Sequence, residues 1–364
     1  YSACSNSDNA ETQRKYKKID RRERKQNKFQ SKKMNIKILG NTTWGSTLAM
    51  LICRAGNDVS LIYRTRDKSE EAQASGVLLV KDFSLEIPKN LKFEHLGDLK
   101  FESSDVLIIA VPSDTIEKNI GYIKTMAMDG ITVISATKGL SKSGDTLSIT
   151  LAKELNLESS QIGTLSGPNL ATEIISGNPA ITSLSFEDIN KANSFRNIFS
   201  SPLFRIYSGN DVIGSEIGGS LKNIIAIGCG IIDKLNLGDN AKSAFITRGL
   251  REITRFGLRR GAKEYTFYGL SGLGDLFATC VSSHSRNWKL GYSIGSGKSV
   301  DQFKKETGYT VEGVEATRIV NMISERDNIS MPITNMTNKV INQEYDPETA
   351  IKEFMTRDLS RERN

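Results

Sequence analysis

A short apolar run, a glycine turn and a helical pattern follow one another at residues 35–54, and this succession most constrains how the chain can fold. The run Asn35–Leu39 predicts a buried strand, Trp44–Arg54 has the spacing of a helix, and Asp58–Tyr63 predicts the next strand. Strands that alternate with helices in this way are typical of a mainly parallel sheet. We therefore expect an α/β fold at the beginning of the chain.

The alternation continues along the first half of the sequence and then stops. Further strands, with helical segments between them, are predicted at Val106–Val111, Thr132–Ala136, Ile162–Leu165, Ile181–Phe186 and Phe204–Tyr207. After about Asp211, helical spacing dominates over Asp211–Leu235, Ala241–Arg259, Val311–Glu325 and Pro347–Thr356. Because 364 residues exceed what one hydrophobic core usually organises, we expect two domains, a parallel α/β domain at 34–210 and an all-helical domain at 211–364.

The positive net charge of +7 comes entirely from residues 1–33. These residues contain 11 Lys and Arg against 4 Asp and Glu, so that 38 residues of each sign remain from the totals of 49 and 42. This extension has no apolar periodicity, and we expect it to be disordered. Because the rest of the chain carries no net charge, we do not expect nucleic acid as a partner.

Location is predicted to be cytoplasmic. The basic, Ser-containing extension leaves a plastid or another organelle as an alternative, although its four acids argue against a transit peptide. The most apolar stretch, Ile224–Ile232, is too short to span a bilayer, so a soluble protein without stable membrane insertion is expected.

Metal chemistry is not predicted. The four cysteines, Cys4, Cys53, Cys229 and Cys280, match neither a zinc pattern nor a redox pair, and the chain has only two histidines. A reducing compartment fits this use of cysteine.

The turn Gly40–Gly45 (GNTTWG) predicts a dinucleotide site. It lies between the first strand and its helix, where backbone N–H groups at a helix N-terminus meet the pyrophosphate in a Rossmann-type domain. Thr42 takes the place of the second glycine of G-x-G-x-x-G, and its Cβ is expected to push the cofactor outward. An ordinary strand-to-helix turn is the alternative.

The end of the second predicted strand indicates which cofactor is preferred. Arg64 and Arg66 follow Tyr63, and no carboxylate appears before Asp67. An acid here would bind the ribose 2′-OH of NADH, whereas arginine accommodates the 2′-phosphate of NADPH. We therefore predict that NADPH is preferred and that NADH can be used; the alternative is a solvated surface turn.

Three later segments carry further candidate residues. Lys138 follows the strand Thr132–Ala136, and the turn Ser166–Ala171 offers N–H groups to an anion. Arg286 is suited to bidentate phosphate binding, and Asn287 can hydrogen-bond a hydroxyl or a phosphate oxygen.

Lys222 is the most informative of the candidates, because it interrupts a helical run of small and apolar residues at 218–228. Burying an unpaired lysine costs several kcal/mol. Lys222 is therefore expected to extend to the surface, to pair with Glu216 or Asp275, or to face a polar active-site cleft.

From Met34 to Arg357 the chain resembles the NAD(P)-dependent glycerol-3-phosphate dehydrogenases of the bacterial and plastid type. The motifs that carry the resemblance, in chain order, are Thr43–Gly45, Thr137–Gly139, Ser166–Ala171, Gly219–Asn223, Leu237–Lys242, Thr247–Gly249, Leu270–Asp275 and Ser285–Asn287. Thr42 departs from the family's more usual glycine, which affects the expected cofactor affinity.

The resemblance implies a role for individual residues. It makes Lys222 the catalytic acid/base, Lys138 a contact to both substrate and cofactor, and Asp275 part of the reacting centre. Its other cofactor contacts are Gly40, Thr43, Trp44, Gly45, Arg64, Ala171, Arg286 and Glu312. Its other substrate contacts are Gly167, Asn169, Ser285, Arg286 and Asn287.

The implied reaction is reversible hydride transfer between NAD(P)H and dihydroxyacetone phosphate, which gives sn-glycerol 3-phosphate for glycerolipid synthesis. Two alternatives stay open at this point: another two-domain hydroxyacid or ketopantoate-type dehydrogenase, and a non-catalytic NADP-binding sensor. Arg286, Asn287 and Lys138 argue against the first, and the presence of Lys222 and Asp275 argues against the second. The sequence leaves assembly as a homodimer open.

Overall fold

The computed structural model describes residues 34–126 and 129–356, which form two compact units. One unit comprises the described residues up to Ser141 together with Asp145–Glu216, and the other comprises Lys142–Gly144 together with those from Ile217 onward. The extension 1–33, predicted to be disordered, lies outside the described residues.

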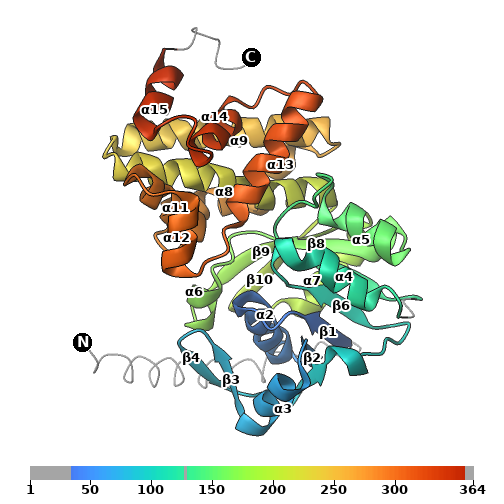
Figure 1. Cartoon of the computed structure of the whole chain (residues 1–364). Helices are drawn as coiled ribbons and strands as arrows, with labels where there is room; N and C mark the ends of the chain where they lie inside the picture. Colours follow the sequence, from blue (N-terminus) through green and yellow to red (C-terminus); the bar gives the residue numbers. More distant parts are fainter. Residues whose placement is uncertain (1–33, 127–128, 357–364) are drawn as a thin grey trace. The chain divides into compact units, whose positions relative to one another are not determined.

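An eight-stranded sheet organises the first unit (Figure 1), and its spatial order is β10-β9-β8-β7-β6-β1-β2-β5. All neighbouring strands are parallel except β8 and β9, which are antiparallel. The strands are β1 (Asn35–Leu39), β2 (Asp58–Tyr63), β5 (Leu91–His95), β6 (Val106–Ile109), β7 (Thr132–Ser135), β8 (Ile162–Ser166), β9 (Ala180–Phe186) and β10 (Phe204–Gly209). The predicted Rossmann-type, mainly parallel sheet is thus confirmed.

Helices cover both faces of this sheet. Successive side chains of a strand point to opposite faces, and here the apolar ones on each face pack against helices. Ile36 and Ile38 pack in one core with α2 (Thr43–Arg54), α6 (Ala171–Ile175) and α7 (Ile189–Phe199). Leu39 packs in the other core with α4 (Ile116–Ile123) and α5 (Leu147–Leu155). Both faces are therefore apolar, as buried parallel strands require.

Lys37 is buried in β1 and makes an ion pair. Its Nζ lies 2.6 Å from Asp105 Oδ2, and both residues are buried. The charge in this otherwise apolar strand is therefore compensated.

The sequence prediction missed four elements between β2 and β6. These are α3 (Arg66–Ser75), the antiparallel hairpin of β3 (Val77–Val80) and β4 (Phe83–Glu86), and the edge strand β5. The β5 segment, LKFEH, alternates apolar and polar residues over only five positions, which is a weak signal in a single sequence. Short 3₁₀ turns complete the unit: η1 (Leu96–Asp98), η2 (Ser113–Thr115) and η3 (Ser159–Gln161).

The second unit is helical throughout its described part, as predicted (Figure 1). The long helices are α8 (Val212–Lys234), α9 (Gly238–Arg259) and α13 (Glu312–Arg326), and the first residues of α8 belong to the first unit. The shorter ones are α10 (Asp275–Val281), α11 (Arg286–Gly295), α12 (Val300–Thr307), α14 (Pro332–Ile341) and α15 (Pro347–Met355), with the 3₁₀ helix η4 (Glu264–Tyr268) and the π-helix η5 (Leu270–Gly274). Lys142–Gly144 joins this unit, where Arg260 Nη2 donates to the Gly144 carbonyl at 3.1 Å.

In the described part of the chain, no helix is both long enough and apolar enough to cross a membrane.

Candidate active site

The turn after β1 requires glycine at two positions. Gly40 has a φ of +121°, and a Cβ added there would lie 2.6 Å from the Ala110 carbonyl oxygen. A Cβ added at Gly45 would lie only 1.9 Å from the Gly40 carbonyl oxygen. The two glycines therefore allow the close backbone contacts of the turn where helix α2 begins, and the N–H groups at this helix N-terminus suit a pyrophosphate.

Thr42 has a structural role that explains why it replaces glycine. It is the N-cap of α2, and its Oγ1 accepts from the Gly45 N–H at 3.0 Å while donating to the Ala110 carbonyl at 2.8 Å. The hydroxyl thus joins the turn to the end of β6, an N-cap being worth about 1 kcal/mol. Trp44, in the first turn of the same helix, packs edge-on against Phe204, with ring centroids 6.5 Å apart.

The two arginines at the end of β2 have different environments. Arg64 is exposed, and among the described residues no carboxylate pairs with it. Arg66 instead pairs with Asp98, with Nη2 and Oδ1 2.7 Å apart. Arg64 is therefore the one whose guanidinium is not held by an acid in this part of the chain.

The ends of β7 and β8 bring three predicted residues together. Lys138 Nζ donates to the Gly167 carbonyl at 3.0 Å, and Asn169 Nδ2 donates to Thr182 Oγ1 at 2.8 Å. Asn169 Oδ1 and Ser166 Oγ are buried without a hydrogen-bond partner among the residues described. Buried polar atoms without partners are rare, so these two atoms mark a place where a ligand can supply the missing hydrogen bonds.

Lys222 and Asp275 form a buried ion pair in the second unit. Lys222 Nζ lies 2.5 Å from Asp275 Oδ1 and donates to Thr279 Oγ1 at 2.7 Å. Lys222 is 6% exposed and Asp275 is 1% exposed. Of the two predicted partners, Asp275 is the one that pairs with Lys222, while Glu216 accepts from the Ser148 N–H at 3.0 Å.

A close approach of two backbones accompanies this pair. A Cβ added at Gly218 would lie 2.4 Å from the Ser271 carbonyl oxygen and 3.3 Å from Gly272 Cα. Gly218 precedes Lys222 by about one turn of α8, and the π-helix η5 leads directly into Asp275. The glycine lets the two segments touch, and π-helical turns of this kind are frequent at functional sites.

Two buried cysteines lie near this pair. Burial raises the pKa of the Cys280 thiol well above its usual value, aided by a hydrogen bond with Cys229, although the nearby Lys222 charge acts in the opposite direction. Both cysteines are fully buried free thiols. In such surroundings an ion pair or a charged hydrogen bond is stronger than in water.

Asn287 connects three helices near the start of α11. Its Nδ2 donates to Asn223 Oδ1 at 2.9 Å, and its Oδ1 accepts from the Gly313 N–H at 2.9 Å. Gly313 is the second residue of α13, so that Glu312 stands at the N-terminus of a helix held by Asn287.

The N-terminus of α11 presents an exposed cation. Ser285 Oγ caps the helix by accepting from the Trp288 N–H at 3.2 Å, and Arg286 is the exposed first residue. A guanidinium beside a helix N-terminus is well suited to a phosphate group.

Family models match both parts of the chain. The model described as the N-terminus of NAD-dependent glycerol-3-phosphate dehydrogenase matches residues 35–192, and that of its C-terminus matches residues 211–352. The chain belongs to this family. The resemblance stated from the motifs is confirmed, and this family member is an oxidoreductase.

Full-length relatives agree with the family models. The glycerol-3-phosphate dehydrogenase [NAD(P)+] of Clostridium botulinum (strain Eklund 17B / Type B) is 38% identical over 90% of this chain and 98% of its own length. That of Fusobacterium nucleatum is 35% identical, covering 89% and 97%. The crystal structure of glycerol-3-phosphate dehydrogenase from Coxiella burnetii has a TM-score of 0.81 at 33% identity, covering 89% of this chain and 99% of that one.

Within this glycerol-3-phosphate dehydrogenase family member, the predicted site residues divide between the two units. The first unit holds those at the ends of β1, β2, β7 and β8, and the second holds those on α8, α10, α11 and α13. Ala171 is the first residue of α6, and Thr43 is the first of α2.

Two residues of the second group were missed from the sequence. Thr279 follows Asp275 by four positions on α10, the spacing that places two side chains on one helix face, and this signal could have indicated it. Asn223 is adjacent to Lys222, but its hydrogen bond to Asn287 spans 64 positions, and no local pattern reports that contact.

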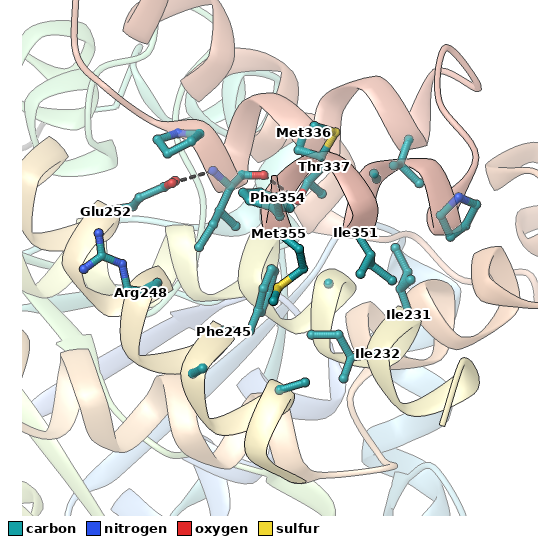
Figure 2. A pocket seen from close by; sticks show the side chains of 18 of the residues that line it. Ile231, Ile232, Phe245, Arg248, Glu252, Met336, Thr337, Ile351, Phe354 and Met355 are labelled. Atoms are coloured by element: carbon teal, nitrogen blue, oxygen red, sulfur yellow. Dashed lines mark hydrogen bonds between the residues drawn. The ribbon is translucent and has the colours of Figure 1, made fainter. Parts of the chain in front are cut away.

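A separate cavity of about 1040 Å³ lies among α8, α9, α14 and α15. Its walls are mainly apolar, and Figure 2 shows Phe245, Ile232 and Met355 among the side chains that line it. Glu252 accepts from the Ile333 N–H at the start of α14, and burial raises its pKa to about 7. None of the predicted site residues lines this cavity, so it is distinct from the candidate active site.

Proposed function

We propose that the chain catalyses reversible hydride transfer between NAD(P)H and dihydroxyacetone phosphate, giving sn-glycerol 3-phosphate. The observation that carries this proposal is the buried Lys222–Asp275–Thr279 cluster on the chain that also presents Arg286 at a helix start. The first group is suited to a carbonyl and the second to a phosphate, which are the reacting group and the charged group of this substrate.

Lys222 acts on the carbonyl oxygen in this proposal. Its ammonium group stabilises the negative charge that develops there and donates the proton that the alkoxide needs. Asp275 Oδ1 and Thr279 Oγ1 orient Nζ, because each lies within hydrogen-bond distance of it. Arg286 and the N-terminus of α11 hold the phosphate.

We assign cofactor binding to the first unit, where the Gly40–Gly45 turn at the N-terminus of α2 fits a pyrophosphate. The bound nicotinamide supplies or accepts the hydride. Lys138 and Asn169 help to orient the reacting groups from the ends of β7 and β8. We further propose that NADPH is preferred over NADH, because Arg64 is exposed at the end of β2 and no carboxylate pairs with it in the described part.

A homodimer and a cytoplasmic location stay predictions, as does the absence of nucleic acid among the partners. The same holds for the domain bounds 34–210 and 211–364.

The test is the oxidation of NADPH and of NADH by purified protein with dihydroxyacetone phosphate. We expect turnover with the phosphorylated ketone and little with dihydroxyacetone, because Arg286 would lose its ligand. Comparable kcat/KM for the two ketones would contradict phosphate recognition. Absence of turnover with either cofactor would contradict the proposed reaction itself.

A further inference from the structure

Arg66 is one of two arginines that follow β2, but an acid holds it. Its Nη2 lies 2.7 Å from Asp98 Oδ1, and the two side chains are 54% and 52% exposed. The sequence alone showed two arginines after this strand and placed only Arg64 among the cofactor contacts, and this ion pair separates the two.

The position of Asp98 beside the sheet determines on which side of β2 the Arg66 guanidinium lies. Asp98 belongs to η1, which directly follows β5, and β5 lies on the side of β2 opposite β1. The glycine turn assigned to the pyrophosphate follows β1. Arg66 is therefore held toward the outer edge of the sheet, on the side of β2 away from that turn.

His95 fixes the neighbouring backbone. Its Nδ1 accepts from the Gly97 N–H at 3.2 Å, which leaves the proton on Nε2, and Nε2 donates to the Arg64 carbonyl at 3.2 Å. This hydrogen bond joins the chain just after β2 to the last residue of β5. Asp98 Oδ2 lies 3.9 Å from His95 Nδ1, but this nitrogen carries no proton when it accepts from Gly97, so Asp98 is joined to Arg66 and not to His95.

We propose that Asp98 is a specificity-determining residue: it holds Arg66 at the outer edge of the sheet, so that only Arg64 meets a 2′-phosphate. The inference rests on the cofactor site proposed above. It implies a weaker preference for NADPH over NADH than two free arginines would produce.

The effect has a limited size because the ion pair is exposed. Exposed ion pairs are weak and are screened by salt. Asp98 therefore favours the paired position of the Arg66 side chain over other positions, but it does not exclude them. We expect Asp98→Asn to raise the ratio of kcat/KM for NADPH to that for NADH by about three- to tenfold at low salt. The kcat/KM for NADH should stay within about twofold, because NADH carries no 2′-phosphate.

A double-mutant cycle tests whether Asp98 acts through Arg66. Asp98→Asn should raise the cofactor ratio in the wild-type background and leave it unchanged in an Arg66→Ala background. An equal rise in both backgrounds would mean that Asp98 acts by its own charge, and it would overturn the proposal. No rise in either would overturn it as well.

A matched control is available in the second unit. Lys298 and Glu306 form an exposed pair of the same kind, 2.6 Å apart and 46% and 52% exposed. Glu306→Gln should leave the cofactor ratio unchanged. A rise equal to that of Asp98→Asn would show a general charge effect and would refute the assignment.

Ligand binding separates this inference from the proposed reaction. Adenosine 2′,5′-bisphosphate and AMP differ by the 2′-phosphate, and their dissociation constants can be measured without turnover. Asp98→Asn should tighten only the bisphosphate. An unchanged bisphosphate constant refutes the role of Asp98 even if the enzyme is active, whereas lack of turnover with tightened bisphosphate binding refutes the reaction alone.

Discussion

Gly218→Ala tests whether backbone contact between α8 and η5 positions the Lys222–Asp275 pair. The added Cβ would lie 2.4 Å from the Ser271 carbonyl oxygen, whereas ordinary contact begins at 3.4 Å. The obstructing atom belongs to the backbone, so no side chain can rotate away. The two segments must separate by about 1 Å, because closely packed interiors have no free volume to absorb the methyl group.

A separation of this size is comparable to the tolerance of the site. It would lengthen the Lys222 Nζ to Asp275 Oδ1 distance from 2.5 Å to about 3.5 Å, the outer limit of a hydrogen bond. Misplacement by 1 Å can cost about 100-fold in rate, and we expect kcat to fall by about 10- to 100-fold. Overpacking should also cost about 1–3 kcal/mol of stability.

The assay measures kcat, KM for dihydroxyacetone phosphate and the NADPH dissociation constant on folded protein of known active fraction. The NADPH constant should stay unchanged, because the glycine turn of β1 belongs to the other unit. Gly121→Ala is the matched control, since Gly121 lies in helix α4 with nothing within 4 Å of an added Cβ. If Gly218→Ala retains kcat within about twofold of wild type, the close approach does not position the pair.

Three further results are expected. Lys222→Ala should lower kcat by about 100- to 10,000-fold while NADPH binding is retained. Lys234→Ala, on the same helix, should leave kcat unchanged. If the Lys222→Ala variant keeps a tenth of the wild-type rate, Lys222 is not the proton donor. Arg286→Lys should raise KM for dihydroxyacetone phosphate at least tenfold, because an ammonium cannot make paired hydrogen bonds to phosphate, and an unchanged KM would exclude Arg286 from the phosphate site. Burial raises the pKa of Glu216 from 4.5 to about 7, so the folded state binds the proton more tightly and Glu216 costs stability as the pH rises between these values. Glu216→Gln should therefore gain about 3 kcal/mol relative to wild type between pH 5 and pH 8 in denaturant unfolding, and parallel pH profiles would contradict this.

Patterns within a single element explain most of what was predicted correctly. The strands β1 and β2 and the helices α8, α9 and α13 are long or apolar enough for their own periodicity to identify them. The β5 edge strand and the β3–β4 hairpin were missed because these segments of four or five residues are too short to show a period and are strands only through pairing with a neighbour.

The sequence by itself determined which residue types were available for the chemistry, and it narrowed Lys222 to three environments. Only the tertiary structure decided among them, since Asp275 lies 53 positions away and Thr279 57 positions away. The same holds for Thr42, whose hydroxyl bonds to Ala110, and for Arg66, which Asp98 holds at the sheet edge. Local periodicity follows from the geometry of one helix or strand, whereas the partner of a charged or polar side chain depends on which distant segments pack against it, and that is a property of the folded chain.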